Sequence, residues 1–218
     1  MRAGGRVSKA QSSPADYWNE RALRFGHDLK TLAYGSKATQ ERKFDVLLSA
    51  IPERRVTLLD IGCGFADLYT HMRARGYDIT YTGVDIAAEI VALARAAHPE
   101  LRILAGDVLG GDLIAGERFE YVVSTGINCA VNGHNEAIER ALLRTAFDRS
   151  TRAAIIALQS SVYLQSHPEA AADGTSWFSD PTALCDYALK NITPWVALRH
   201  DYMPHDFTLF LFREPRLA

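Results

Sequence analysis

From residue 56 onward, short apolar runs alternate with stretches in which apolar residues recur every three or four positions. Short apolar runs between polar or glycine positions are typical of buried strands, and the longer spacing is typical of helices packed on one face. Strand–helix–strand units of this kind build a parallel sheet covered by helices. Strands are expected at 56–61, 79–85, 101–105, 119–125 and 153–158, and helices at 66–75, 87–97 and 135–147.

The N-terminal part departs from this rhythm. Residues 1–14 are rich in Gly, Ser and Arg and are expected to form a disordered tail. Residues 15–52 carry two helical patterns before the first strand, and we interpret them as a helical lid on the core, with amphipathic helices that simply complete the core as the alternative. A core over residues 56–213 and no second apolar core predict a single domain that spans residues 15–218.

The C-terminal part predicts a different closure of the sheet. Residues 160–180 form a long polar connection, and loops of that length are often functional. Asp180-Pro181 then predicts a helix start, with a capping carboxylate followed by proline in the first turn. Two last apolar runs, 195–202 and 207–213, predict a closing antiparallel hairpin.

Composition disfavours several classes of function. The net charge is −2 and no block of basic residues stands out, so we expect no nucleic-acid partner. No apolar run approaches the roughly 20 residues of a membrane helix, and the N-terminus lacks the apolar core of a secretion signal. The cysteines Cys63, Cys129 and Cys185 form no C-x-x-C pair, which argues against a disulfide framework and fits a cytoplasmic protein. Without a His or carboxylate cluster at ligand spacing, we expect no metal.

The turn after the first expected strand carries the strongest chemical signal. Asp60 ends the strand, and Gly62 and Gly64 follow before a helix begins. Glycines between strand and helix let the backbone approach a ligand closely. The dinucleotide fingerprint G-x-G-x-x-G would place its third glycine at Asp67, and two acids at this turn would repel a pyrophosphate. The turn therefore favours a ligand that carries positive charge.

Two further acids follow the next two expected strands. Asp85 ends the second strand, where an acid accepts hydrogen bonds from a ribose diol in such sheets. Asp107 follows the third strand, from where it can reach an adenine edge. Either acid alone would more often be a loop cap or a solvated end. Together, at successive strand ends, they predict an adenosine pocket.

The ordered segments LLDIGCGFADL, YTGVDI, LAGDV and FEYVVSTG, with the closing hairpin, resemble the class I S-adenosylmethionine-dependent methyltransferases from Leu58 to Arg213. The family's first motif is acid-x-G-x-G-x-G, and Ala66 stands at its third glycine here. The resemblance implies an α/β, doubly wound Rossmann-like fold, with a seven-stranded, mostly parallel sheet and an antiparallel strand in the C-terminal hairpin. It also implies S-adenosylmethionine as cofactor and S-adenosylhomocysteine as product.

The resemblance also implies roles for individual residues. Gly62 and Gly64 would line the methionine part of the cofactor, and Asp60 would lie near its amino group. The remaining implied contacts are Asp85 on the ribose, Asp107 on the adenine amine, Ile86 and Val108 on the ring, Ser124 and Thr125 beside the methyl group, and Cys63, Asp67 and Leu68 from the glycine turn. We hold Gln40 and Lys43 as candidates for the cofactor carboxylate.

For the catalytic residues, His134 is the first candidate for a general base, because it lies in the loop after the fourth strand. His200 and His205-Asp206 in the hairpin come second, and each histidine has the alternative of a surface or capping role. An acceptor pocket could be walled by aromatic residues of the long connection, with packing on the core as the alternative. These aromatic residues are Tyr163, Trp177 and Phe178.

The expected function is methyl transfer to O or N of a small-molecule acceptor. Base-directed nucleic-acid methyltransferases often carry an Asn/Asp-Pro-Pro-aromatic run after the fourth strand, and Ser124-Thr125-Gly126-Ile127-Asn128 does not match it. One alternative is a non-catalytic protein that binds S-adenosylmethionine or S-adenosylhomocysteine. Another is a non-methyl use of the fold, such as aminopropyl transfer. No pattern in the sequence indicates the acceptor or the oligomeric state.

Overall fold

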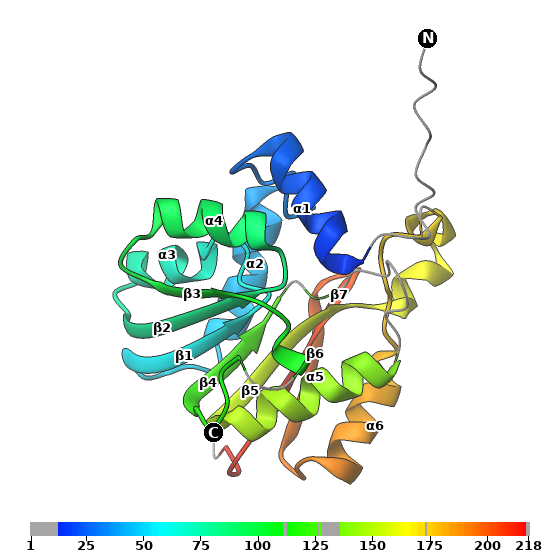
Figure 1. Cartoon of the computed structure of the whole chain (residues 1–218). Coiled ribbons are helices and arrows are strands. Elements are labelled where there is room, and N and C mark those ends of the chain that lie inside the picture. Colours follow the sequence, from blue (N-terminus) through cyan, green and yellow to red (C-terminus); the bar gives the residue numbers. More distant parts are fainter. Residues whose placement is uncertain (1–12, 111–112, 126, 128–135, 173, 217–218) are drawn as a thin grey trace.

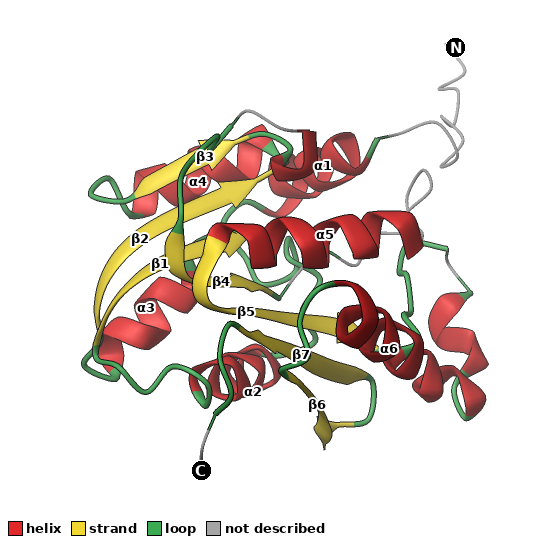
Figure 2. Cartoon of the chain, turned by 90° about the horizontal axis from the view of Figure 1, so that it is seen from below, coloured by secondary structure: helices red, strands yellow, loops and turns green. Residues whose placement is uncertain are grey.

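A seven-stranded mixed sheet forms the centre of the molecule (Figures 1 and 2). The computed structural model describes residues 13–110, 113–125, 127, 136–172 and 174–216. The strands are β1 (Arg55–Ile61), β2 (Asp78–Asp85), β3 (Arg102–Ala105), β4 (Phe119–Ser124), β5 (Ser150–Gln159), β6 (Val196–Met203) and β7 (Asp206–Phe212). Their order is β3-β2-β1-β4-β5-β7-β6. The order reverses between β1 and β4, and in open sheets of this type ligands bind at such a switch point.

Helices cover both faces of the sheet, as the alternating pattern predicts (Figure 1). They are α2 (Lys37–Leu48), α3 (Asp67–Ala74), α4 (Ala88–Ala97), α5 (Glu136–Arg149) and α6 (Pro181–Asn191). On β1, Leu58 packs in the cluster with α2, α3 and α4, whereas Leu59 packs in the cluster with α5 and α6. Both leucines are fully buried, because successive strand side chains point to opposite faces and helices cover both of them.

The C-terminal hairpin closes the sheet as the sequence predicts. β7 pairs antiparallel with both β5 and β6, so it is inserted between them and β6 becomes an edge strand. The capped helix start is also confirmed: the side chain of Asp180 accepts hydrogen bonds from the N–H groups of Thr182 and Ala183. Within the connection of residues 160–180, the expected loop contains two short 3₁₀ turns, Ser161–Gln165 and Pro168–Ala171.

The N-terminal helix α1 (Pro14–Phe25) lies over α4 (Figure 1). It begins one residue earlier than expected, because Ser13 and Asp16 form a reciprocal capping box and Pro14 occupies the first turn. Pro14 therefore belongs to the helix and not to a tail. The side-chain oxygen of Asn19 accepts the N–H of Glu89, which ties α1 to the start of α4. In the described part of the chain, no helix is long and apolar enough to span a membrane.

Candidate functional site

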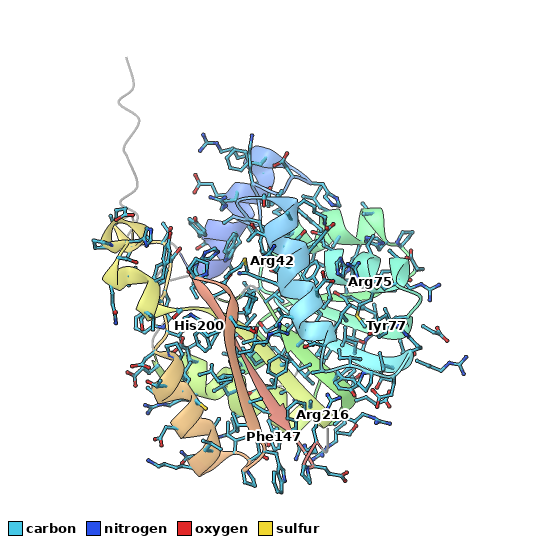
Figure 3. The ribbon with its side chains drawn as sticks, turned by 180° about the vertical axis from the view of Figure 1, so that it is seen from behind. Arg42, Arg75, Tyr77, Phe147, His200 and Arg216 are labelled. Atoms are coloured by element: carbon cyan, nitrogen blue, oxygen red, sulfur yellow. The ribbon has the colours of Figure 1, made fainter. Side chains whose placement is uncertain are left out.

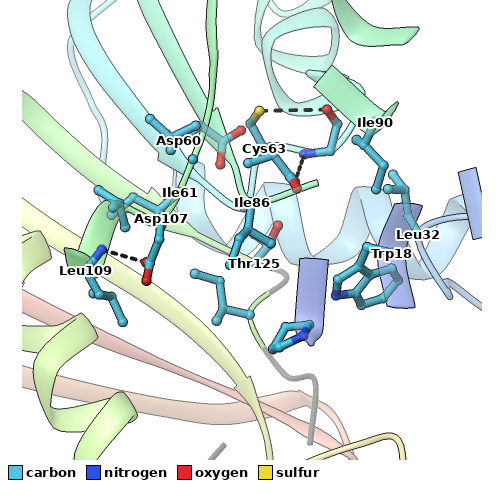
Figure 4. A pocket seen from close by; sticks show the side chains of 18 of the residues that line it. Trp18, Leu32, Asp60, Ile61, Cys63, Ile86, Ile90, Asp107, Leu109 and Thr125 are labelled. Atoms are coloured by element: carbon cyan, nitrogen blue, oxygen red, sulfur yellow. Dashed lines mark hydrogen bonds between the residues drawn. The ribbon is translucent and has the colours of Figure 1, made fainter. Parts of the chain in front are cut away.

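A cavity of about 480 Å³ opens at the carboxyl ends of β1, β2 and β4 and extends under α1 and α2. It contains four carboxylates, and none of its described lining residues is Lys, Arg or His. The four carboxylates belong to Asp60, Asp67, Asp85 and Asp107. Figure 4 shows Trp18 and Leu32 from the N-terminal segment beside Ile90, on the other side of the cavity from Asp60. The cavity therefore has an acidic floor and an apolar roof.

The glycine turn after β1 has the backbone that its residues predict. Gly62 and Gly64 have φ of 72° and 54°, in the left-handed region that glycine adopts without steric cost. A Cβ on Gly64 would also lie 3.0 Å from a methyl carbon of Leu32, so this glycine allows the N-terminal segment to pack closely. Ala66, at the family's third glycine, has a φ of 61° and directly precedes α3.

Asp85 holds this turn in place from the end of β2. Its Oδ2 accepts the N–H of Gly64 at 3.0 Å, and its Oδ1 accepts the N–H of Ala87 at 3.0 Å. Burial raises the pKa of Asp85, and the backbone hydrogen bonds oppose that shift. Each carboxylate oxygen has a further lone pair that it can direct into the cavity. Asp85 therefore shapes the turn and also presents an acceptor to a ligand.

Asp60 has an unsatisfied oxygen at the cavity. Its Oδ2 accepts the hydroxyl of Tyr81 at 2.8 Å, whereas its buried Oδ1 has no hydrogen-bond partner among the described residues. Burial raises the pKa of Asp60 to about 7, against the effect of Tyr81. A buried acceptor without a partner is costly unless a donor completes it. The side chain is therefore suited to an ammonium group of a bound ligand.

Asp67, at the first turn of α3, ties that helix to α2. Its Oδ2 accepts the side-chain amide of Gln40 at 2.9 Å, and its Oδ1 lies 3.3 Å from the ammonium of Lys37. The same ammonium donates to Gln40 Oε1 at 2.7 Å. This triad of Lys37, Gln40 and Asp67 joins α2 to the start of α3, and two of its members, Gln40 and Asp67, line the cavity.

Another part of the cavity has the features of a nucleobase pocket. Asp107 lies on the rim after β3, and its Oδ1 accepts the N–H of Leu109 at 2.8 Å. Ile86 is 37% exposed and Val108 is buried, and both line the cavity near this acid. Apolar side chains together with a hydrogen-bond acceptor suit the ring and the amine of an adenine.

Near the end of β4, two hydroxyl groups line the cavity. The hydroxyl of Tyr34 donates to Thr125 Oγ1 at 3.4 Å, and both residues line the cavity. Lys43 places its ammonium 5.4 Å from the centre of the Tyr34 ring, and it forms a buried ion pair with Asp206 at 3.0 Å. Burial raises the pKa of the Tyr34 phenol, so its hydroxyl stays protonated near neutral pH.

The expected cofactor contacts are brought together with one exception. The cavity is lined by Asp60, Gly62, Cys63, Gly64, Asp67, Leu68, Asp85, Ile86, Asp107, Val108 and Thr125. Ser124 is not among these lining residues: it ends β4 fully buried, and its Oγ has no partner within the described structure. Tyr34, within the expected helical lid of residues 15–52, also lines the cavity, and its hydroxyl partner Thr125 is 91 residues away in the chain.

The expected catalytic and acceptor residues differ in where they lie relative to the cavity. His134 lies outside the described residues. His200 lies on β6 (Figure 3) and does not line the cavity, because the insertion of β7 makes β6 the edge strand. Gln40 lines the cavity, but Lys43 is occupied by Asp206. Tyr163 and Phe178 are not among the lining residues, and Trp177 instead donates its indole N–H to Glu139 at 2.9 Å.

Comparisons with known proteins agree with this geometry. Residues 58–148 match the family model described as "Methyltransferase domain". Rv1506c of Mycobacterium tuberculosis strain H37Rv, provisionally named a methyltransferase, is 27% identical over 159 residues, which cover 70% of this chain and 90% of that protein.

Solved structures share the fold. Magnesium protoporphyrin IX methyltransferase from Synechocystis PCC 6803, crystallised with S-adenosylhomocysteine, aligns with a TM-score of 0.67 and 14% identity over 92% of this chain and 98% of that one. An O-methyltransferase family protein from Burkholderia thailandensis aligns with a TM-score of 0.65 and 15% identity over 90% of this chain and 64% of that one. The family match over residues 58–148, the motifs and the sheet order together support a class I S-adenosylmethionine-dependent methyltransferase.

Proposed function

We propose that this protein transfers the methyl group of S-adenosylmethionine to an oxygen or nitrogen atom of a small, uncharged and largely apolar acceptor. The observation that carries the proposal is the distribution of polar groups in the cavity. Four carboxylates line the cavity after β1, β2 and β3 and at the start of α3, whereas the part near the end of β4 offers only the hydroxyls of Tyr34 and Thr125 among its described polar side chains. The acidic part fits the cationic cofactor, and the hydroxyl-lined part fits the acceptor.

The acidic residues of the cavity fit the cofactor group by group. Asp107 would accept the adenine amine, Asp85 would hold the ribose hydroxyls, and the unpartnered Oδ1 of Asp60 would accept the amino group. A buried carboxylate oxygen that lacks a donor in the protein is completed by an ammonium donor on the ligand. Carboxylates around the binding site also favour a ligand with a sulfonium charge.

Catalysis by this site rests on alignment. The sulfonium supplies an activated methyl group when the cofactor is bound. The chain's own residues hold the acceptor in line, and correct orientation accounts for roughly 7–11 kcal/mol in favourable intramolecular reactions. The apolar side chains of Trp18, Leu32 and Phe44 line the cavity and would limit the access of water to a bound ligand. The hydroxyls of Tyr34 and Thr125 are placed to orient the acceptor's oxygen or nitrogen.

A general base is needed only for an acceptor that arrives protonated. His134 stays our candidate for that base. A protonated Tyr34 is a poor base at neutral pH, because burial raises its pKa, but it can donate a hydrogen bond. We therefore assign Tyr34 an orienting role toward the acceptor.

The charges of the described lining residues support an uncharged acceptor. No described lining residue carries a positive side chain that could pair with a carboxylate or phosphate on the acceptor. A buried anion without a cation is strongly disfavoured. We therefore favour phenols, alcohols and neutral amines over acids.

A location in the cytoplasm is consistent with the free thiols of Cys63 and Cys185.

The experiment is an S-adenosylhomocysteine release assay with a panel of uncharged phenols and amines, and with carboxylated versions of the same rings as matched controls. The proposal predicts release with one or more neutral compounds and much slower release with their carboxylated partners. Turnover of the carboxylated compounds alone would overturn the acceptor class. Tight cofactor binding without turnover of any panel member would favour the alternative of a non-catalytic binding protein.

A further inference from the structure

The charges around Asp60 and Asp67 in the cavity are unbalanced for an amino-acid ligand. The amino-acid part of the cofactor carries both an ammonium and a carboxylate group. Both acids line the cavity, and Asp60 leaves a buried oxygen unpartnered, so an acceptor for the ammonium is present. A ligand carboxylate between these two acids would be repelled unless a cation lay nearby.

Two described lysines contact residues that line the cavity. Lys43 lies over the ring of Tyr34, but its ammonium is committed to Asp206, whose carboxylate is completely buried. Moving that ammonium toward a ligand would leave the buried Asp206 carboxylate with only the imidazole of His205, 3.4 Å away, beside it, which is costly. Lys43 is therefore a structural cation and is poorly suited to the ligand.

Lys37 has the properties that Lys43 lacks. Its side chain is 53% exposed, so its ammonium can move toward a ligand without leaving a buried charge alone. Its two partners, Gln40 Oε1 at 2.7 Å and Asp67 Oδ1 at 3.3 Å, both belong to residues that line the cavity. An ammonium has three protons, so one remains for a third acceptor. The triad of Lys37, Gln40 and Asp67 thus holds a cation at the acidic end.

We propose that Lys37 recognises the carboxylate of the cofactor's amino-acid part, while Asp67 and Gln40 hold its ammonium at the mouth of the cavity and Asp60 accepts the ligand's amino group. This inference rests on the proposed function, because it assumes that the ligand is S-adenosylmethionine or S-adenosylhomocysteine. It replaces Lys43 by Lys37 as the carboxylate contact. It also predicts that Lys37 affects the binding only of ligands that carry the amino-acid part.

The inference is tested by calorimetric titration with two ligands. S-adenosylhomocysteine carries the amino-acid part, and 5′-methylthioadenosine has the same nucleoside and thioether without it. The variants are Lys37→Met, which removes the charge, and Lys37→Arg, which keeps it. Lys190→Met is the matched control, because Lys190 is also an exposed lysine paired with an aspartate. Thermal unfolding of each variant reports whether the fold is intact.

We expect Lys37→Met to lower the affinity for S-adenosylhomocysteine about fivefold, which is the size of effect expected for a partly exposed ion pair. Affinity for 5′-methylthioadenosine should stay unchanged, Lys37→Arg should retain most of the affinity for S-adenosylhomocysteine, and Lys190→Met should resemble the wild type. If Lys37→Met binds S-adenosylhomocysteine as tightly as the wild type, the assignment of Lys37 is overturned and the proposed function stands. If Lys37→Met loses affinity for both ligands equally, Lys37 has a purely structural role and the assignment is overturned. Failure of the wild type to bind either ligand would instead remove the proposed function on which the assignment rests.

Discussion

The carboxylate of Asp85 accepts the backbone N–H of Gly64 at 3.0 Å, and this contact joins the end of β2 to the glycine turn of β1. The second oxygen of Asp85 accepts the N–H of Ala87 at 3.0 Å, just before α4 begins. One side chain therefore fixes the start of a helix and the turn that faces the cavity. The residue expected to bind a ribose also organises the backbone around the ligand.

Replacing Asp85 by Ala should affect binding and stability together. Two buried N–H groups would lose their acceptor, which lowers the free energy of unfolding by about 1–3 kcal/mol. We expect S-adenosylhomocysteine affinity to fall more than about tenfold. Asp78→Ala, at the exposed start of the same strand, is the control and should change both by little, because exposed ion pairs contribute about 0–1 kcal/mol. Urea unfolding and calorimetry check the two effects, and wild-type affinity in Asp85→Ala would contradict the ribose role.

The raised pKa of Asp60 predicts that cofactor binding depends on pH. With a pKa of about 7 in the free protein, Asp60 is mostly protonated at pH 6 and mostly ionised at pH 8. Only the ionised carboxylate pairs with the ligand's ammonium, so affinity for S-adenosylhomocysteine should rise between pH 6 and 7.5. Calorimetry across this range should show that Asp60→Asn binds S-adenosylhomocysteine more weakly than the wild type and with an affinity that does not change with pH. Parallel profiles for the two proteins would show that Asp60 does not control binding.

The same pKa shift has a consequence for the stability of the free protein. Because the pKa of Asp60 is higher in the folded state than its ordinary value of 3.8, the folded state holds the proton more tightly between pH 4 and 7. Stability from this group is therefore largest at low pH and falls as the pH rises toward 7. Relative to Asp60→Asn, the wild type should lose stability between pH 5 and 7.5 in urea unfolding. If the difference in the free energy of unfolding between the two proteins stays constant over this pH range, the raised pKa of Asp60 is contradicted.

The buried ion pair between Lys43 and Asp206 predicts a strong difference between single and double variants. Lys43→Met leaves the fully buried Asp206 carboxylate without its cation and should lower the free energy of unfolding by about 3–5 kcal/mol. Adding Asp206→Asn removes the stranded charge and should restore part of that loss. Urea unfolding of the wild type, both single variants and the double variant gives the coupling. If the effects simply add, the pair is not a structural unit.

Tyr34→Phe should separate acceptor orientation from cofactor binding. The ring that faces Lys43 is kept, and only the hydroxyl near Thr125 is lost. Affinity for S-adenosylhomocysteine should stay within about twofold, while methyl transfer to an acceptor from the release assay should slow about tenfold or more. Tyr163→Phe, at a ring that does not line the cavity, is the control. Equal activity of Tyr34→Phe and the wild type would contradict the orienting role.

Features that depend on local sequence were the ones that could be predicted. The Asp180 cap, the alternation of strands and helices and the glycine turn each arise from residues close together in the chain. Ala66 shows the limit of such patterns, because it has the left-handed backbone of a glycine position and is tolerated there as alanine.

Features that depend on packing between distant segments could not be predicted. The Tyr34–Thr125 contact spans 91 residues, and no local pattern signals it. The choice between Lys37 and Lys43 depends on which lysine lies beside Asp206 in the folded chain. The position of His200 also depends on such packing, since β7 is inserted between β5 and β6 and places that histidine on the edge strand, away from the cavity lining.

The central claim is that the cavity at the ends of β1, β2 and β4 binds S-adenosylmethionine. Calorimetric titration of the full chain with S-adenosylmethionine and S-adenosylhomocysteine at pH 7.5 tests it most directly. The account predicts that both ligands bind with one site per chain and with dissociation constants on the order of micromolar. The absence of binding by either ligand to the folded wild-type protein would contradict the cofactor assignment and every role that we derive from it.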